Sequence, residues 1–169
     1  MKHFLLSIIS LIIAVFIIFV SFDKFYYQDY VIDCKSLLYK DYASLKDSLE
    51  SYDILESFSG TITAYGPDCE GCIGITASGY DVRNTIYYDD KEYGKVLIVA
   101  GDKKYPFGTI VRFKNIKNKD PFIAIVLDRG SAIGLSKRSQ FDLLFENESC
   151  SYDFGIHYNA LFEILRYGF

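Results

Sequence analysis

The sequence lacks internal repeats, low-complexity segments and an excess of basic charge. Its 18 Lys and Arg residues are outnumbered by 22 Asp and Glu residues, the two kinds are interspersed, and the net charge is −4. Nucleic-acid-binding proteins instead gather basic residues on one face or in one stretch. Nothing in this pattern indicates a nucleic-acid partner, and we predict none.

A ligand set for a metal ion is missing as well. Cys69 and Cys72 form a Cys-x-x-Cys pair, but no second pair follows at the spacing of a zinc ribbon. The acidic stretch at residues 89–92 lacks the spacing of an EF-hand and is typical of a hairpin tip. A thioredoxin-like redox role requires a βαβ setting that the sequence does not contain. We therefore predict no metal and no cofactor.

The first residues contain a long run without charge. It extends for 19 residues, from Phe4 to Phe22, and as a helix it would rise roughly 28 Å, close to the thickness of a bilayer's hydrocarbon core. The run ends in FVSFDK, without the small residues of a cleavage site, so an uncleaved anchor is favoured over a signal peptide. Lys2 and the α-amino group precede the run, and Asp23, Lys24, Asp29 and Asp33 follow it, so the excess of basic groups on the N-terminal side is small. We predict a single-pass anchor at residues 1–24 in the cell membrane, with a cytoplasmic N-terminus and an extracytoplasmic C-terminal domain.

Residues 25–59 are predicted to form a juxtamembrane stalk. Within residues 35–58, leucine and tyrosine recur at spacings of four and three, at Leu38, Tyr42, Leu45, Leu49 and Tyr52. This pattern predicts a short amphipathic helix with a narrow apolar stripe. A stalk is favoured over a coiled coil between two copies, because two heptads fall short of the three or four required. Any self-association through this helix is expected to be weak.

The residue pattern changes after residue 59, and residues 60–169 are predicted to form one mainly β domain. Short apolar or alternating runs, such as TIVRFKN and FIAIVL, are separated by Gly, Asn, Asp and Pro. In the first run, Val111 and Phe113 would face one side of a strand while Arg112 and Lys114 face the other. The second run is apolar on both faces and predicts a central strand. No segment with helical periodicity interrupts them, and the length suits a compact β-barrel.

The cysteines of this domain leave alternatives open. A disulfide between Cys69 and Cys72 is chemically permitted outside the cytoplasm and would close a short loop. Two free thiols are the other interpretation, and the spacing does not decide between them. Cys34 and Cys150 lie on either side of the domain, and the sequence does not indicate whether they pair.

Three aspartates are candidates for chemistry because of their positions. Asp102 and Asp128 follow apolar strands, and Asp142 lies within the segment FDLLF. An aspartate at a strand end is commonly a turn former. Asp142 differs, because its apolar neighbours would desolvate the carboxyl, raise its pKa and allow it to hold a proton near neutrality. A general acid requires that property.

Four segments match a known family in order. They are GTITAYGPDCEGCIGITASGYDV, VLIVAGDKKYPFGTIV, VLDRGSAIG and FDLLF, and together they resemble the Asp-Asp-Asp (3D) domain of membrane-bound lytic transglycosylase A and of stationary-phase-survival proteins. The stretch YPFGTIVRFKNI is also similar to rare lipoprotein A, a more distant relative. The resemblance implies a double-psi β-barrel whose three aspartates are Asp102, Asp128 and Asp142. The loop at residues 128–134 departs from the family's usual pattern.

The resemblance also implies a reaction. Lytic transglycosylases cleave the MurNAc–GlcNAc bond of peptidoglycan with the sugar's own 6-hydroxyl as nucleophile, so one carboxyl serves as acid and then as base. Asp142 is expected in that role, Asp128 would orient it or bind substrate, and Asp102 would hold a loop. Ordinary glycosidases instead need two carboxylates. A non-catalytic module that binds peptidoglycan through the same barrel is the alternative function.

Further residues are candidates for binding the glycan. The substrate carries carboxylates, so a net-negative enzyme needs local cations, and Arg129, Lys137 and Arg138 lie in the loop between the last two candidate aspartates. A solvated surface loop is the other interpretation of these three residues. Thr76 and Ser78 could offer hydroxyls to sugar oxygens, or could simply form a turn.

Overall fold

The computed structural model describes residues 52–169. Within this range no helix has both the length and the apolar character needed to cross a membrane. The predicted membrane span at residues 4–22 lies outside the described residues, and so does most of the predicted stalk helix.

The described part of the chain consists of strands and one short helix. In chain order they are β1 (Glu56–Tyr65), β2 (Tyr87–Asp90), β3 (Gly94–Gly101), β4 (Ile110–Lys114), β5 (Phe122–Asp128), β6 (Phe141–Leu144), α2 (Glu148–Phe154) and β7 (His157–Arg166). The domain is therefore mainly β, as its short alternating runs predict.

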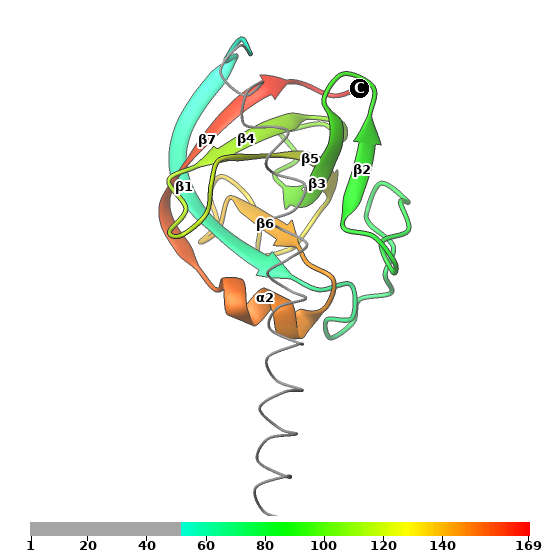
Figure 1. Ribbon diagram of the computed structural model, residues 1–169. Helices are drawn as coiled ribbons and strands as arrows, with labels where there is room; N and C mark the ends of the chain where they lie inside the picture. Colours follow the sequence, from blue (N-terminus) through cyan, green and yellow to red (C-terminus); the bar gives the residue numbers. More distant parts are fainter. Residues whose placement is uncertain (1–51) are drawn as a thin grey trace, which may run out of the picture. The chain divides into compact units, whose positions relative to one another are not determined.

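Six of the strands close into a barrel (Figure 1). The sheet has the order β2-β3-β5-β4-β7-β1-β6. An additional pairing of β3 with β6 closes the six strands from β3 to β6 into a ring, and β2 is appended to the outside of β3. The β1–β6 and β3–β5 pairs are parallel, and the other pairs are antiparallel. Closure leaves none of the six barrel strands with an unpaired edge.

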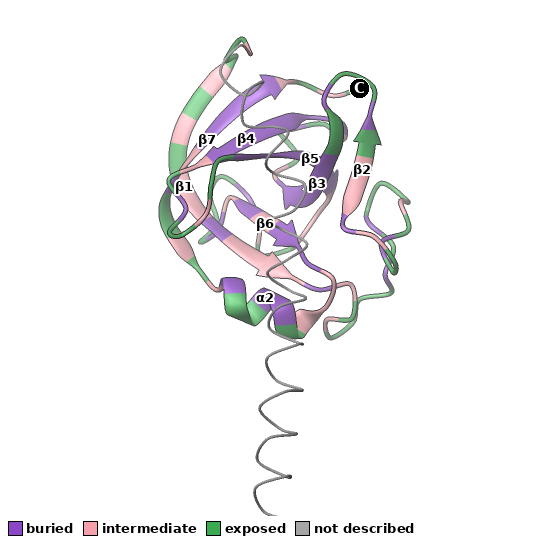
Figure 2. Cartoon of the chain, viewed as in Figure 1, coloured by how far each residue is buried: buried purple, intermediate pink, exposed green. Residues whose placement is uncertain are grey.

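Apolar side chains fill the barrel, and Figure 2 shows buried residues concentrated on its central strands. Strand β5, at FIAIVL, lies between β3 and β4 and is buried on both faces, which confirms its prediction as a central strand. A cluster of rings packs around Phe141, with Phe113 and Phe162 in edge-on contact at 5.4 and 5.0 Å between centroids. Such aromatic contacts add to the free energy gained by burying the rings.

Strand β4 differs from its predicted half-buried pattern. Val111 and Phe113 are buried as predicted, but Arg112 on the other face is only 4% exposed. Its Nε donates to Glu163 Oε2 of β7 at 2.5 Å, and Lys114 Nζ donates to Oε1 of the same carboxylate at 3.3 Å. The sequence pattern could not reveal this ion pair, because its partner comes from a strand 51 residues away.

Two further local features depart from the sequence predictions. The helix predicted within residues 35–58 does not reach its predicted end, because β1 begins at Glu56. Leu55 N donates to Ile164 O, and the rings of Phe58 and Phe162 lie 5.3 Å apart between centroids. The helix α2 was not predicted from periodicity because it spans only 7 residues. Its start is defined by Asn147, whose side-chain oxygen accepts from Cys150 N, a typical N-cap.

The acidic stretch at residues 89–92 forms the tip of the β2–β3 hairpin, as predicted. Asp90 is not solvated there. The residue is only 7% exposed, and its carboxylate accepts a hydrogen bond from Arg166 at the end of β7, with Nη2 and Oδ2 separated by 2.6 Å. This ion pair fastens the appended strand β2 to the barrel.

Candidate functional site

The barrel brings two of the three candidate aspartates to one row of its wall. In the strand register, Ala100 of β3 is paired with Asp142 of β6 on one side and with Asp128 of β5 on the other. Thr63 of β1 is paired with Asp142 in turn. Neighbouring strands lie roughly 5 Å apart, so residues from four strands converge although they are far apart in the sequence.

Asp142 is half-buried and holds one hydrogen bond. Thr63 Oγ1 donates to Asp142 Oδ1 at 2.6 Å, and no hydrogen bond from the described residues reaches Oδ2. Burial raises the pKa of the Asp142 carboxyl to about 6, the Thr63 hydrogen bond lowers it, and the charges of Glu148 and Asp128 raise it. The sequence prediction of a raised pKa for Asp142 has this physical basis: desolvation disfavours the ionised form.

Asp128 has three hydrogen-bond donors. Its Oδ1 accepts from Ala77 N at 2.8 Å and from Arg129 N at 2.7 Å, and its Oδ2 accepts from Tyr65 Oη at 2.6 Å. Burial raises the pKa of the Tyr65 phenol, and the adjacent Asp128 carboxylate raises it further. These bonds tie Asp128 to the end of β1 and to the loop that carries Ala77.

Asp102 lies at the exit of β3 and holds loop backbone. Its Oδ1 accepts from Lys104 N at 2.8 Å, and its Oδ2 accepts from Leu135 N at 2.9 Å. These two hydrogen bonds lower the pKa of the Asp102 carboxyl. A side chain at Gly134 would come within 2.6 Å of Asp102 Oδ2, so glycine permits this close approach. Asp102 thus connects the β3 exit to the loop that leads into β6.

Arg129, a predicted substrate cation, is engaged by the protein itself. Its guanidinium donates to the carbonyl oxygens of Tyr105 at 2.7 Å, Asp128 at 3.0 Å and Gly101 at 3.3 Å. It also lies over the ring of Phe107, 4.2 Å from the centroid. Arg129 therefore fastens the ends of β3 and β5 together, and its charge is directed at backbone carbonyls.

The other predicted substrate residues divide by exposure. Thr76 is buried at 4% exposure, and its hydroxyl accepts from Tyr80 N at 3.0 Å, which is turn chemistry. Ser78, Lys137 and Arg138 are exposed on loops. The Ser78 hydroxyl lies within hydrogen-bond distance of the Thr76 hydroxyl, at 3.0 Å, so Ser78 shares in the same turn.

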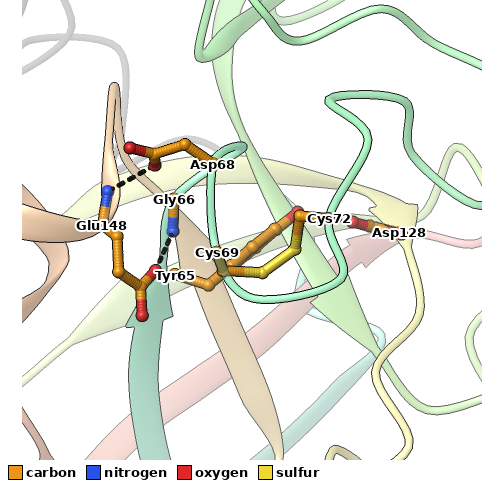
Figure 3. The surroundings of a disulfide bond; sticks show 7 residues. All are labelled: Tyr65, Gly66, Asp68, Cys69, Cys72, Asp128 and Glu148. Carbon is orange, nitrogen blue, oxygen red and sulfur yellow. Dashed lines mark hydrogen bonds between the residues drawn. A yellow bond between two sulfur atoms is a disulfide. The ribbon is translucent and has the colours of Figure 1, made fainter.

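A disulfide joins Cys69 to Cys72 in the loop after β1, and its surroundings include Tyr65 and Asp128 (Figure 3). Cys150 is disulfide-bonded too, and no cysteine of the described range is free. The structure thus resolves the choice between a disulfide and two free thiols for the Cys-x-x-Cys pair.

The same loop is locked to the start of α2. Gly66 N donates to Glu148 Oε2 at 2.9 Å, and Glu148 N donates to Asp68 Oδ1 at 2.7 Å (Figure 3). A side chain at Gly66 would meet the backbone of α2 at 2.1 Å, so this contact requires glycine. Glu148 is a residue that sequence reasoning missed. The available signal was its place just after Asn147, a favoured N-cap residue.

The site thus contains one carboxyl with a raised pKa, that of Asp142, beside polar groups that are fixed by hydrogen bonds. No cluster of potential metal ligands occurs among residues 52–169. Thr63 donates a hydrogen bond to Asp142, Tyr65 donates one to Asp128, and the charge of Asp128 acts on Asp142. Asp102 instead holds the adjoining loop. A proton held near neutral pH by Asp142 is suited to acid–base chemistry.

No protein-family model matches the chain. The chain is 33% identical over 102 residues to the SPbeta prophage-derived uncharacterized protein YorM of Bacillus subtilis (strain 168), an alignment that covers 60% of this chain and 39% of that protein. The chain thus spans about two-fifths of the length of this relative. Among solved structures, Streptomyces papain inhibitor (SPI) is similar with a TM-score of 0.40 and 14% identity, over 69% of this chain and 100% of that chain.

Proposed function

We propose that this protein is a membrane-anchored lytic transglycosylase that cleaves the MurNAc–GlcNAc bond of peptidoglycan, with Asp142 as its single acid–base residue. The observation that carries the proposal is the half-buried Asp142 carboxyl, whose pKa burial raises to about 6. About half of this carboxyl holds a proton at pH 6 and about a tenth at pH 7, so a proton is available to donate.

The proposed reaction has two steps. Asp142 first gives its proton to the glycosidic oxygen as the bond from that oxygen to C1 of MurNAc breaks. The 6-hydroxyl of the same sugar then attacks C1, and its proton passes to Asp142. The products are a 1,6-anhydro end and a free 4-hydroxyl, and Asp142 returns to its starting state without any water being consumed.

The hydrogen bonding of Asp128 supports a one-carboxyl reaction. A glycosidase that uses water needs a second carboxylate as base or nucleophile. Both oxygens of Asp128 already accept hydrogen bonds: two bonds come from backbone N–H groups and one from the Tyr65 hydroxyl. Such a carboxylate is suited to holding the wall of the site, and its charge contributes to the raised pKa of Asp142.

The proposal extends to the type of barrel and to its location. Two parallel pairs, β1–β6 and β3–β5, within a closed six-stranded barrel are compatible with the double-psi arrangement implied by the motif resemblance. The uncharged run at residues 4–22 supports an anchor that holds the domain at the extracytoplasmic face of the membrane, next to peptidoglycan.

The test is the digestion of purified peptidoglycan by the full-length protein in detergent. We expect soluble fragments with 1,6-anhydro ends, detected by mass spectrometry. The Asp142→Asn variant should lose at least ~100-fold of this activity, because general acid–base catalysis contributes roughly 10²–10⁴-fold. Its melting temperature should not fall below that of the wild type, since a neutral amide replaces a half-buried carboxyl.

Asp102→Asn is the matched control, because it makes the same chemical change at a carboxyl that holds loop backbone. This variant should keep most of its activity and lose some stability. Products with only reducing ends, or full activity in Asp142→Asn, would contradict the proposed reaction.

A peptidoglycan-binding module without catalysis is the second candidate. The observation that favours it is Arg129, which lies in the loop at residues 128–134 where the sequence departs from the family pattern. Its guanidinium donates to the backbone carbonyls of Gly101, Tyr105 and Asp128. Under this alternative the wild type would sediment with peptidoglycan and release no soluble fragments. Asp142→Asn would then bind as tightly as the wild type.

A further inference from the structure

The two oxygens of Asp142 are not equivalent. Oδ1 accepts the Thr63 hydroxyl at 2.6 Å, whereas Oδ2 takes no hydrogen bond from the described residues. Thr63 is itself held in register, because it is paired with Asp142 across the parallel β1–β6 ladder. A β-branched residue in a strand has a restricted χ1, so its hydroxyl is aimed with little conformational freedom.

We propose that Thr63 is the positioning residue of the site: it holds Oδ1 of Asp142, so that Oδ2 is the oxygen that releases and recovers the proton. This inference rests on the proposed function for the reaction step, but the arrangement itself can be tested without any substrate. Thr63 acts through Asp142 and does not need to touch the glycan.

The effect of Thr63 opposes that of its surroundings. Its hydrogen bond favours the ionised carboxylate, whereas burial and the charges of Glu148 on α2 and Asp128 on β5 favour the protonated form. The hydroxyl of Tyr65 on β1 donates its hydrogen bond to Asp128, whereas the hydroxyl of Thr63 donates to Asp142. On the β3 side, the residue paired with Asp142 is Ala100, which carries no charge. Removing the Thr63 hydroxyl should therefore raise the pKa of Asp142.

The experiment is a carboxyl titration by NMR on the full-length protein in detergent micelles, with aspartate labelled by ¹³C. The Asp142 signal is identified by its loss in Asp142→Asn. Thr63→Val replaces the hydroxyl by a methyl group of similar size. We expect the titration midpoint of Asp142 to rise by roughly one pKa unit, the scale of one hydrogen bond to a charged group.

Two variants separate the hydroxyl from other effects. Thr63→Ser keeps the hydroxyl and should restore the wild-type midpoint. Thr61→Val makes the same substitution two residues earlier on β1, at a side chain that does not contact Asp142 through a hydrogen bond, and should leave the midpoint unchanged. Thr63→Ala repeats the test without the steric demand of valine. An unchanged midpoint in the Thr63→Val and Thr63→Ala variants would overturn the proposal.

Activity provides an independent readout when it is measured at pH 5, below the titration midpoint of Asp142 in both proteins, so that the carboxyl is protonated in each. If the wild type cleaves peptidoglycan, Thr63→Val should then lower kcat by roughly tenfold or more with little change in KM, because the carboxyl is no longer held in place, and Thr63→Ser should recover it. An equal loss in the Thr63→Ser variant would contradict the positioning role. A wild type without activity, combined with the expected titration shift, would reject the proposed function and leave the link between Thr63 and Asp142 established.

Discussion

Asp128 and Asp142 are paired in register with the same residue, Ala100, yet their carboxylates have opposite surroundings. Asp128 accepts three hydrogen bonds, two of them from backbone N–H groups. Asp142 accepts one, from a hydroxyl, and burial raises its pKa to about 6. The barrel thus places two identical side chains two strands apart and gives one a structural environment and the other an environment suited to proton transfer.

The two carboxylates differ in their hydrogen-bond donors because Asp128 lies at the end of its strand and Asp142 lies within its strand. Strand β5 ends at Asp128, where loop N–H groups are available as donors. Asp142 is the second residue of β6, where the backbone N–H groups pair with neighbouring strands. Its carboxylate therefore depends on side-chain donors, and Thr63 supplies the one that is present. A carboxylate with fewer donors in a buried setting retains its proton more readily.

The pH dependence of activity should show this difference most strongly. If Asp142 must be protonated to act, its active fraction falls about tenfold per pH unit above its pKa of about 6. We expect kcat/KM for peptidoglycan cleavage to fall roughly 50-fold between pH 6 and pH 8. The residual activity of Asp142→Asn should lack this decrease. A rate that stays constant up to pH 8 would exclude Asp142 as the acid.

Removing each carboxylate should affect stability unequally. Asp128→Ala loses three hydrogen bonds, and we expect the free energy of unfolding to fall by about 3 kcal/mol, or about 1 kcal/mol per bond. Asp142→Ala loses one bond and a half-buried charge, so its cost should be about 1 kcal/mol or less. Urea unfolding at pH 7 measures both. Equal losses would show that the hydrogen-bond counts do not distinguish the two sites.

The sequence predicted the parts of this site that depend on local pattern. Alternating and continuous apolar runs located β3, β4, β5 and β6, and the apolar neighbours of Asp142 indicated its raised pKa. The central position of β5 also followed from a run that is apolar on both faces. These features depend on residues close together in the chain, which is where periodicity carries information.

The remaining features depend on contacts between distant segments. Thr63 and Asp142 are 79 residues apart, and the hydrogen bonds between the Gly66 loop and Glu148 span 80 or more. The engagement of Arg129 with backbone carbonyls likewise requires the barrel to be closed. No pattern within one segment encodes such pairs, so the donor of Asp142 and the carboxylate on α2 were missed.

A third test compares Asp142 with Asp102, whose pKa values shift in opposite directions. The raised pKa of Asp142 means that its stabilising contribution is present below its unfolded value, roughly 4, and is lost as pH rises through about 6. Asp142→Asn should therefore melt above the wild type at pH 8, and this gap should close by pH 4. Scanning calorimetry across this range measures the effect.

Asp102 should show the reverse. Its lowered pKa means that its contribution is present above the unfolded value and is lost as pH falls through the folded one. Asp102→Asn should melt below the wild type at neutral pH, with the difference disappearing in strongly acidic solution. Parallel pH profiles for the two variants would contradict the opposite environments assigned to these carboxyls.

Removing the disulfide beside Asp128 should have the smallest effect on the titration of Asp142. Cys69 and Cys72 are separated by three positions, so their bond closes a very short loop. The entropy of such a loop corresponds to about 2 kcal/mol at most, and the lock between Gly66 and Glu148 remains when the bond is removed. The double variant Cys69→Ser/Cys72→Ser should therefore lose no more than ~2 kcal/mol in the free energy of unfolding. Mass spectrometry of the unreduced wild-type peptide should first show the loss of two hydrogens.

Because Asp142 is hydrogen-bonded to Thr63 and not to this loop, the Cys69→Ser/Cys72→Ser variant should also keep the carboxyl titration of Asp142 unchanged. A shifted midpoint in this variant would show that the loop acts on Asp142 as well as on Asp128, and would remove the distinction between the two carboxylates.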